Sequence, residues 1–356
     1  MAIELSELLL SAVQQNASDL HLTQDMPPIL RIDGVLVPLK VEVLSEAVMK
    51  KMIYDVLSDS QKIQFEEEKE LDFSLALPGL DRFRVNVHQQ RGSVEAAFRR
   101  IPLFIPTMDD LRLPPVVGSL SRKRNGLVLV TGPTGMGKST TLAAMVQLIN
   151  SEERCMVMCI EDPIEFLHTN KKSIIKQREV YRDTHSFAEA LKRCLRQDPD
   201  VIVVGEMRDL ETISTVLTAA ETGHLVLATL HTPDAPQTIE RIIDVFPPYQ
   251  QQQVRQQLAS CIQGVICQRL IPRSNGRGRA LALEVLVATP AIRNMIREES
   301  IEQIPTAMQT GIQFGMKTMD RSLKELVESG DISLDTALSH AKNIEELRQF
   351  LKFPKG

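Results

Sequence analysis

The stretch Gly126-Leu127-Val128-Leu129-Val130-Thr131, continued by Gly132-Pro133-Thr134-Gly135-Met136-Gly137-Lys138-Ser139-Thr140, decides the fold. Its second half matches the phosphate-binding pattern G-x-x-x-x-G-K-[ST], with a short apolar strand before it and a helical pattern after it. Glycines in such a loop let main-chain N–H groups turn toward phosphate oxygens, and the following helix adds the positive end of its dipole. We therefore predict an ATP-binding P-loop, in which Lys138 reaches the β- and γ-phosphates and Ser139 ligates Mg²⁺.

Three more apolar runs of strand length follow the P-loop, at residues 155–160, 201–204 and 225–230, and helical patterns separate them. Apolar strands that alternate with helices are typical of a parallel sheet covered on both faces. Beyond Arg241 the pattern becomes mostly helical, with one strand-like run at residues 281–287. This part of the chain is thus predicted to be an α/β domain with a helical C-terminal part.

Polar residues stand where each of these strands ends. Glu161 follows the second strand, with Asp162 and Glu165 close behind, Glu206 follows the third strand, and His231 follows the fourth. Open parallel sheets bind ligands at the carboxyl ends of their strands, so these side chains are expected to gather beside the P-loop. This arrangement predicts a site that hydrolyses the γ-phosphate of ATP.

Hydrolysis needs a group that orients a water molecule and takes its proton. Glu206 is the first candidate, because it ends the strand where Walker B acids stand, and Glu161 is the alternative; the sequence does not separate the two. Gly205 replaces the metal-holding aspartate of many P-loop enzymes, so Mg²⁺ is expected on Ser139, phosphate oxygens and water.

Two histidines flank the fourth strand. His231, at its carboxyl end, is predicted to sense the γ-phosphate. His224 precedes the strand and lies roughly 23 Å away at about 3.3 Å per residue, so the two cannot act on one atom. We expect His224 to be structural or to lie at an interface.

The first hundred residues show a mixed pattern. A helix is expected over residues 5–13, a hairpin of strands 29–32 and 35–37 around Asp33-Gly34, and a helix capped by Ser45. The buried face of that last helix is predicted to hold Val48, Met52, Ile53 and Val56. Strand-like runs follow at residues 71–77, 82–88 and 94–98. We predict an α+β domain over residues 1–100, a proline-rich linker over 101–120, and the ATPase domain over 121–356.

Composition excludes several classes of protein. Of 356 residues 43% are hydrophobic and 24% charged, as in soluble globular proteins, and no apolar run reaches the roughly 20 residues of a membrane span. The first ten residues lack the basic start of a signal peptide, so a cytoplasmic location is expected. The net charge of −5, with 3 Tyr and no Trp, argues against nucleic-acid binding.

The cysteines are expected to be free thiols in the core rather than a metal site, because they lie in apolar segments and form no CxxC pair. They are Cys155, Cys159, Cys194, Cys261 and Cys267.

The chain as a whole resembles the secretion-type ATPases of type II secretion and type IV pili. The motifs that carry the resemblance occur in that family's order: the P-loop, the acidic box 161–165, the Gly205-to-Asp209 Walker B segment, and the histidine box from Gly223 to Thr232, after an opening Ser18-Asp19-Leu20-His21. The resemblance implies a PAS-like N-terminal domain, a RecA-like motor domain and a homohexameric ring. Met136 stands where most relatives have serine, and we expect little effect on binding.

Within that family, residues 291–298 (Ala-Ile-Arg-Asn-Met-Ile-Arg-Glu) look like a motif of the pilus retraction ATPases, with Met295 where that motif has leucine. Thr289 can cap this helix, and Pro290 suits its first turn. The four-cysteine zinc insertion of extension and type II secretion ATPases is missing between Arg269 and Leu281. Both features favour retraction of pili, as in twitching motility, although an ordinary packing helix is the alternative at 291–298.

The resemblance also implies that arginines from the N-terminal domain act on the phosphates, with Arg84 and Arg99 as candidates and Arg91 as a weaker one. The implied partners are an inner-membrane platform protein, at the inner face of the cytoplasmic membrane, and other pilus ATPases. Three alternatives remain: a pilus extension or type II secretion ATPase, an accessory ATP-binding ring, and a RecA-like DNA translocase, which the net charge disfavours.

Overall fold

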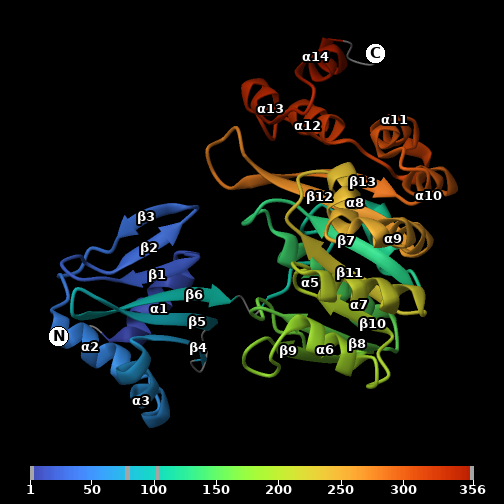
Figure 1. Ribbon diagram of the computed structural model, residues 1–356. Coiled ribbons are helices and arrows are strands. Elements are labelled where there is room, and N and C mark those ends of the chain that lie inside the picture. The colour runs from blue at the N-terminus through green and yellow to red at the C-terminus, as the bar shows by residue number, and fades with distance from the viewer. Residues whose placement is uncertain (1–3, 77–80, 102–103, 353–356) are drawn as a thin grey trace. The chain divides into compact units, whose positions relative to one another are not determined.

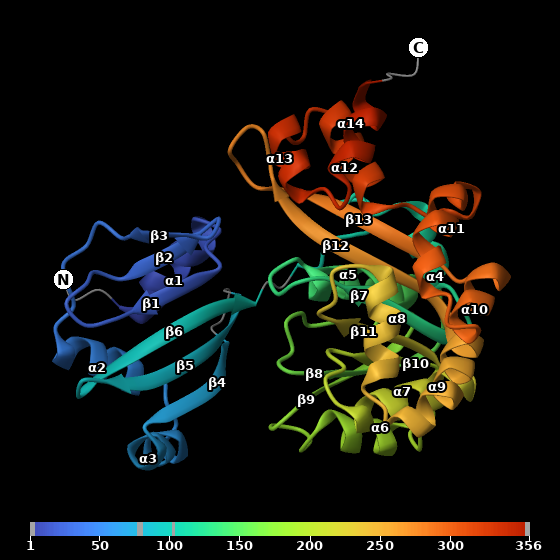
Figure 2. The same ribbon diagram turned by 45° about the horizontal axis from the view of Figure 1, so that its top comes forward.

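The computed structural model describes residues 4–76, 81–101 and 104–352 (Figure 1). The chain divides into two compact units, Met1–Phe104 and Ile105–Gly356. The predicted fold class is confirmed, because each unit combines helices with its own sheet. Figure 2 shows the same elements from a second direction.

The first unit is an antiparallel sheet with three helices. Its strands run in the order β3-β2-β1-β6-β5-β4. The helices are α1 (Leu5–Gln14), α2 (Glu46–Tyr54) and α3 (Asp59–Glu68), and the strands are β1 (Asp19–Leu22), β2 (Ile29–Ile32), β3 (Val35–Pro38), β4 (Glu70–Ala76), β5 (Arg82–Gln90) and β6 (Ser93–Ile101).

The local predictions for this unit are mostly confirmed. β2 and β3 form the expected hairpin, and Asp33 and Gly34 both have positive φ, as the tight turn requires. Ser45 caps α2 by accepting a hydrogen bond from the Val48 N–H. The predicted buried face of α2 is wrong at Val48, which is 37% exposed, because Met49 turns into the core instead. Leu77, the end of a predicted strand, lies outside the described residues.

The second unit holds a seven-stranded sheet in the order β13-β12-β7-β11-β10-β8-β9. Its strands are β7 (Gly126–Thr131), β8 (Met156–Glu161), β9 (Ile174–Glu179), β10 (Val201–Val204), β11 (Leu225–Leu230), β12 (Ile262–Pro272) and β13 (Arg279–Val287). Its helices are α4 (Pro115–Ser121), α5 (Lys138–Glu152), α6 (Phe187–Cys194), α7 (Leu210–Glu221), α8 (Ala235–Asp244), α9 (Pro248–Cys261), α10 (Pro290–Arg297), α11 (Ile304–Thr310), α12 (Met319–Glu328), α13 (Leu334–His340) and α14 (Ile344–Lys352), with short 3-10 helices η1 (Ile301–Gln303) and η2 (Ile312–Phe314).

The sheet is buried on both faces, which explains the continuous apolar strands. Leu127 and Leu129 of β7 pack into a core shared with α6 to α11, whereas Val128 and Val130 pack into a core shared with α4 and α5. β7, β8, β9, β10, β11 and β12 pair in parallel, and β13 is antiparallel to β12. The carboxyl ends of β7, β11, β10 and β8 therefore lie in a row along one edge.

The prediction of a mostly helical region beyond Arg241 is wrong in one respect. β12 is an 11-residue strand that lies between β7 and β13. Its sequence escaped the apolar criterion because Gln263, Gln268 and Arg269 interrupt it. β9, a half-exposed strand at the other edge of the sheet, was likewise not predicted.

Part of the predicted linker belongs to the second unit. Helix α4 begins at Pro115, which suits a first helical turn, and buries Val117 and Leu120 against the sheet. Pro102 and Leu103 lie outside the described residues. All five cysteines are free, four of them buried and Cys155 half-buried.

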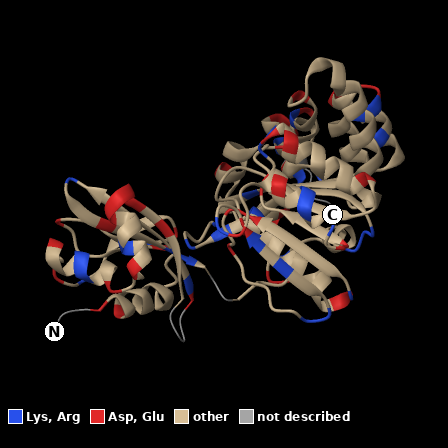
Figure 3. Ribbon diagram, turned by 60° about the horizontal axis from the view of Figure 1, so that its bottom comes forward, with Lys and Arg blue, Asp and Glu red and all other residues tan. Residues whose placement is uncertain are grey.

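The surface carries both signs of charge. In the view of Figure 3, lysine and arginine are interspersed with aspartate and glutamate on both units. Among the described residues, none of the helices combines the length and the apolarity needed to cross a bilayer.

Candidate nucleotide-hydrolysis site

The P-loop connects β7 to α5. Gly137 is the N-cap of α5 with φ 81°, and Lys138 is its first residue. The Lys138 ammonium is buried and donates to the carbonyl oxygens of Gly132 (2.8 Å) and Pro133 (3.0 Å). Burial lowers the pKa of Lys138 below its ordinary value, and the negative charges of Glu206 and Glu165 oppose that shift. The loop thus holds a cation at its centre, as phosphate binding requires.

His231 joins the P-loop to the acidic side of the site. Its Nδ1 lies 3.3 Å from the Thr134 hydroxyl and 3.5 Å from Lys138 Nζ, and its Nε2 lies 3.1 Å from Glu206 Oε1. Three strand ends therefore meet in one contact chain from β7 through β11 to β10. The predicted gathering of Lys138, His231 and Glu206 at this edge is what the structure contains.

The Glu206 carboxylate is fully engaged. Arg208 forms a bidentate ion pair with it, with Nε 2.7 Å from Oε1 and Nη2 2.7 Å from Oε2. His231 contacts Oε1 as well. Burial alone would raise the pKa of Glu206, but Arg208 and His231 outweigh it, so the pKa lies below its ordinary value. Glu206 is thus a stably ionised carboxylate.

Glu161 has the opposite character. It ends β8, is largely buried, and accepts a hydrogen bond of 2.9 Å from Gln177 Nε2. Burial raises its pKa to about 7, Gln177 acts against that shift, and Glu165 and Glu179 add to it. Gly205 leaves room for it, because a Cβ at position 205 would lie only 3.2 Å from Glu161 Cα. A carboxyl group with this pKa can exchange a proton near neutral pH.

The residues present fit a magnesium ion that arrives with a nucleotide. Ser139 is half-buried in the first turn of α5, where its hydroxyl can serve as one ligand. Within the part of the chain that the structure describes, no group of three or more His, Cys, Asp or Glu side chains is arranged to hold a metal by itself. Phosphate oxygens and water would complete the shell, as magnesium prefers.

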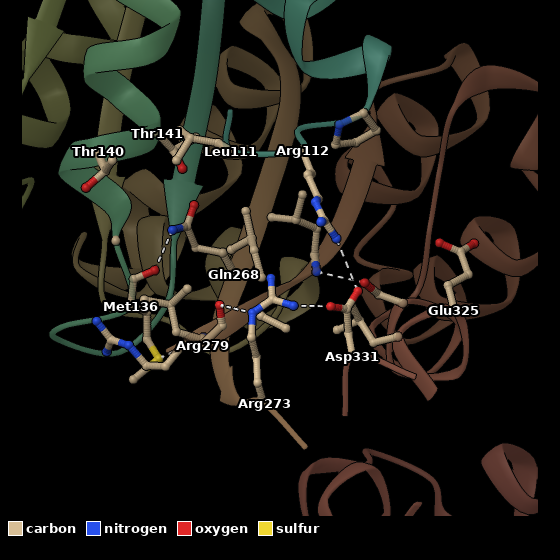
Figure 4. A pocket seen from close by; sticks show the side chains of 18 of the residues that line it. Leu111, Arg112, Met136, Thr140, Thr141, Gln268, Arg273, Arg279, Glu325 and Asp331 are labelled. Atoms are coloured by element: carbon tan, nitrogen blue, oxygen red, sulfur yellow. Dashed lines mark hydrogen bonds and ion pairs between the residues drawn. The ribbon is translucent and has the colours of Figure 1, made fainter. Parts of the chain in front are cut away.

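A cavity of about 460 Å³ opens beside the P-loop (Figure 4). Met136, Gly137, Thr140 and Thr141 form one wall, and Glu161, Glu206 and His231 do not line it. The opposite wall contains an ion-pair cluster in which Asp331 binds both Arg112 (3.2 Å) and Arg273. The cavity thus extends from the P-loop to the first turn of α5 and is not lined by these three side chains.

The remaining predicted residues lie as follows. His224 precedes β11, and its ring Nδ1 lies 3.0 Å from the Ala219 carbonyl at the end of α7, so it has a structural contact. Arg84 and Arg99 are cross-strand neighbours on β5 and β6 in the first unit. Arg99 binds Asp19 at 2.9 Å and remains 72% exposed. Arg91 is in the tight turn at the far end of that hairpin, with positive φ.

The helix at residues 291–298 forms as predicted. Thr289 caps α10 by accepting from the Ile292 N–H, and Ile292 and Ile296 are buried. Arg293 donates from Nη1 to the carbonyls of Ala259 and Ser260, at 2.7 Å each, at the end of α9. A cation at a helix C-terminus stabilises that end, so Arg293 fastens α10 to α9.

Sequence reasoning missed three side chains of the site: Arg208, Gln177 and Gln268. Arg208 had one usable signal, since a cation two residues after Glu206 on an extended segment points to the same side. The two glutamines had none, because they lie on β9 and β12, which were not predicted as strands.

Comparisons with known proteins identify the family of the chain. Residues 115–344 match the family of Type II/IV secretion system proteins. The chain is 49% identical over 340 residues to the type IV pilus retraction ATPase PilT of Pseudomonas aeruginosa, covering 96% of this chain and 98% of that protein. It is 39% identical to the type IV pilus ATPase PilU of the same organism, covering 98% and 92%.

A solved structure extends the likeness to three dimensions. The crystal structure of the pilus retraction motor PilT with bound ADP has a TM-score of 0.90 and 47% identity, and the match covers 98% of this chain and 99% of that one. The chain belongs to the Type II/IV secretion system protein family, in the group that contains the PilT retraction ATPases.

Proposed function

We propose that this protein is an ATP-hydrolysing motor that powers retraction of type IV pili and hence twitching motility. The observation that carries the ATPase assignment is the contact chain Lys138–His231–Glu206, which joins the P-loop to two further strand ends. The assignment to retraction is supported by the near full-length likeness to PilT and by the formed helix α10 at the motif 291–298.

In the proposed reaction a water molecule attacks the γ-phosphate of ATP. Lys138 and the P-loop N–H groups neutralise the charge on the phosphates, and Ser139 would hold a magnesium ion that arrives with the nucleotide, which would supply further positive charge. His231 senses the γ-phosphate and links it to Glu206 through the contact between its Nε2 and the Glu206 carboxylate. The cavity along Thr140 and Thr141 takes the base and the ribose.

Glu161 is the better candidate for the general base, although the sequence alone does not separate it from Glu206. A base must be able to accept a proton at the working pH, and burial raises the pKa of Glu161 to about 7. Glu206 is instead held ionised and turned toward Arg208 and His231, which suits it to positioning the histidine.

The assembly is proposed to be a homohexameric ring in the cytoplasm, against a platform protein at the inner face of the membrane and alongside other pilus ATPases. In such a ring, the half-buried Arg84 and the exposed Arg99 would approach a nucleotide site and neutralise phosphate charge. ATP binding would close the two units and hydrolysis would reopen them, which converts the chemical cycle into movement.

Replacing Glu206 with glutamine tests its positioning role. We expect kcat to fall about 10- to 100-fold, because the bidentate ion pair with Arg208 and the contact with His231 are both weakened. The ATPase activity of this variant should still increase as the pH rises through about 7, because Glu161, the proposed base with that pKa, remains. Steady-state ATPase assays over pH 5.5–9 measure this, with Glu211→Gln, an exposed acid paired with Lys192, as control. A near wild-type kcat for Glu206→Gln would rule out the proposed positioning role of Glu206.

A gene deletion tests the direction of the motor. Cells without a retraction motor should carry excess surface pili and lose twitching, and plasmid-borne wild type but not Lys138→Ala should restore both. Counting pili by electron microscopy measures the first effect. Bald cells would assign the protein to extension instead, and unchanged piliation together with no ATP turnover would favour an accessory ring.

A further inference from the structure

The P-loop of this protein contacts β12 through one buried glutamine, Gln268. β12 pairs in parallel with β7, with Cys267 opposite Thr131, so Gln268 is the next residue at the point where the P-loop begins. A Cβ on Gly132 would lie only 2.4 Å from the main-chain oxygen of Gln268, which is too close for two such atoms. Gly132 also has φ 142°, a backbone conformation that favours glycine. Position 132 therefore has to be glycine because β12 is there.

The side chain of Gln268 reaches the far end of the loop. It is 1% exposed, and its Nε2 donates to the Met136 carbonyl at 2.5 Å (Figure 4). A Cβ on Gly137 would lie 3.3 Å from the same nitrogen. One residue thus contacts the loop at its first glycine and at its last two positions before the lysine.

Neighbouring contacts act in the same direction. The Leu270 N–H lies 3.2 Å from the Met136 sulfur, and Arg279 of β13 donates to the Gly135 carbonyl at 3.2 Å. Met136 thus makes a contact with β12 through its sulfur. A P-loop binds phosphate with inward-facing N–H groups, so the loop carbonyls that Lys138 does not bind need donors from outside the loop.

The second amide atom of Gln268 shows that the side chain does more than fill space. Its Oε1 is buried and has no hydrogen-bond partner among the residues that the structure describes. A buried acceptor without a donor costs stability, so an apolar side chain of this size would pack at lower cost. The hydrogen bond that Nε2 donates to the Met136 carbonyl is therefore the reason for a glutamine at this position.

We propose that Gln268 is a positioning residue for nucleotide binding, which holds the Met136 carbonyl outward and so keeps the P-loop N–H groups turned toward the phosphates. The inference rests on the proposed nucleotide site and adds to it a residue outside the P-loop. Since the N–H groups bind ground state and transition state alike, losing Gln268 should weaken affinity more than turnover.

Gln268→Met, which keeps the length and removes the donor, is the test, and Gln263→Met is its matched control. Gln263 is on the same strand and also donates to a main-chain carbonyl, that of Asn125 at 3.1 Å, away from the P-loop. We expect Gln268→Met to raise the Kd of Mg²⁺-ADP, and the KM for ATP, about tenfold, with kcat within about threefold. The control should leave the Kd and the KM unchanged, and both variants should melt within about 3 °C of the wild type.

Calorimetric titration of the full chain with Mg²⁺-ADP, together with thermal melting, separates the outcomes. Wild-type affinity in Gln268→Met, or an equal loss of affinity in Gln263→Met, would overturn the positioning role. Should Gln268→Met not fold, Gln268→Glu keeps the shape and cannot donate when ionised, and it should weaken binding in the same direction. If the wild type itself binds no nucleotide, the proposed function fails before Gln268 is in question.

Discussion

Replacing Lys138 with alanine should reduce ATP hydrolysis at least about 100-fold and weaken nucleotide binding by a similar factor. The P-loop encloses this ammonium, which the carbonyls of Gly132 and Pro133 hold 3.5 Å from His231. Its removal leaves the triphosphate charge without that counter-ion in a buried position. Radiometric or coupled ATPase assays and Mg²⁺-ADP titration measure the two effects.

The folded state should tolerate this change. Burial lowers the pKa of Lys138, which means that keeping the charge there costs stability, so Tm is expected within about 3 °C of the wild type. Lys172→Ala is the matched control, because Lys172 also donates to a main-chain carbonyl, Glu152 O at 3.4 Å, at the opposite end of α5. A Lys138→Ala protein that binds Mg²⁺-ADP within about threefold of the wild type would contradict the assignment of the loop.

Replacing Glu161 with glutamine should lower kcat by about 100- to 1,000-fold while leaving nucleotide affinity nearly unchanged. The amide keeps the shape and the packing against Gly205 and cannot take a proton from water. Rapid-quench measurement of phosphate release, beside equilibrium titration with ADP, separates loss of chemistry from loss of binding. Glu179→Gln is the control, because Glu179 is the cross-strand neighbour of Glu161 and should leave kcat within about threefold.

The pH dependence adds a second, independent readout for Glu161. A base acts only when ionised, so wild-type activity should rise as pH increases through about 7, the pKa of this carboxyl, and the rise should be absent in Glu161→Gln. Ionisation of Glu161 has opposite effects on activity and on stability, because it enables the base and destabilises the folded state. Because the folded pKa is raised above the unfolded one, the ionised group costs stability above that pKa, so Glu161→Gln should melt at the same temperature or higher at pH 8. A persisting rise through pH 7 in the variant would assign the base elsewhere.

The sequence predicted those parts of the site that depend only on order along the chain. Lys138, Glu206 and His231 each come after a fully buried strand, and Glu161 ends the mostly buried β8. Parallel strands bring such ends to one edge whatever the details of packing. The order of the strands, with β11 between β7 and β10, is what places His231 between Lys138 and Glu206. That order is not written in any one segment.

The supporting side chains could not be predicted for a physical reason. Gln177 and Gln268 lie on strands whose polar residues break the apolar run, and a glutamine acquires a role only once strand register is known. Similarly, the choice between Val48 and Met49 on α2 depends on a rotation of the helix that the local pattern leaves open. Burial and charge pairing, which set the contrasting pKa values of Glu161 and Glu206, likewise exist only in the folded chain.

The β12–β13 hairpin supports the P-loop and carries the C-terminal helices along the same stretch of its two strands. Ile271, Ala280 and Ala282 of the hairpin are buried beneath Met319 and Leu323 of α12. A chain truncated before α12 would therefore expose the apolar underside of the same ribbon on which the phosphate loop rests. Deletions at the C-terminus of this protein should consequently appear as defects in ATP affinity, even though the removed residues touch no phosphate.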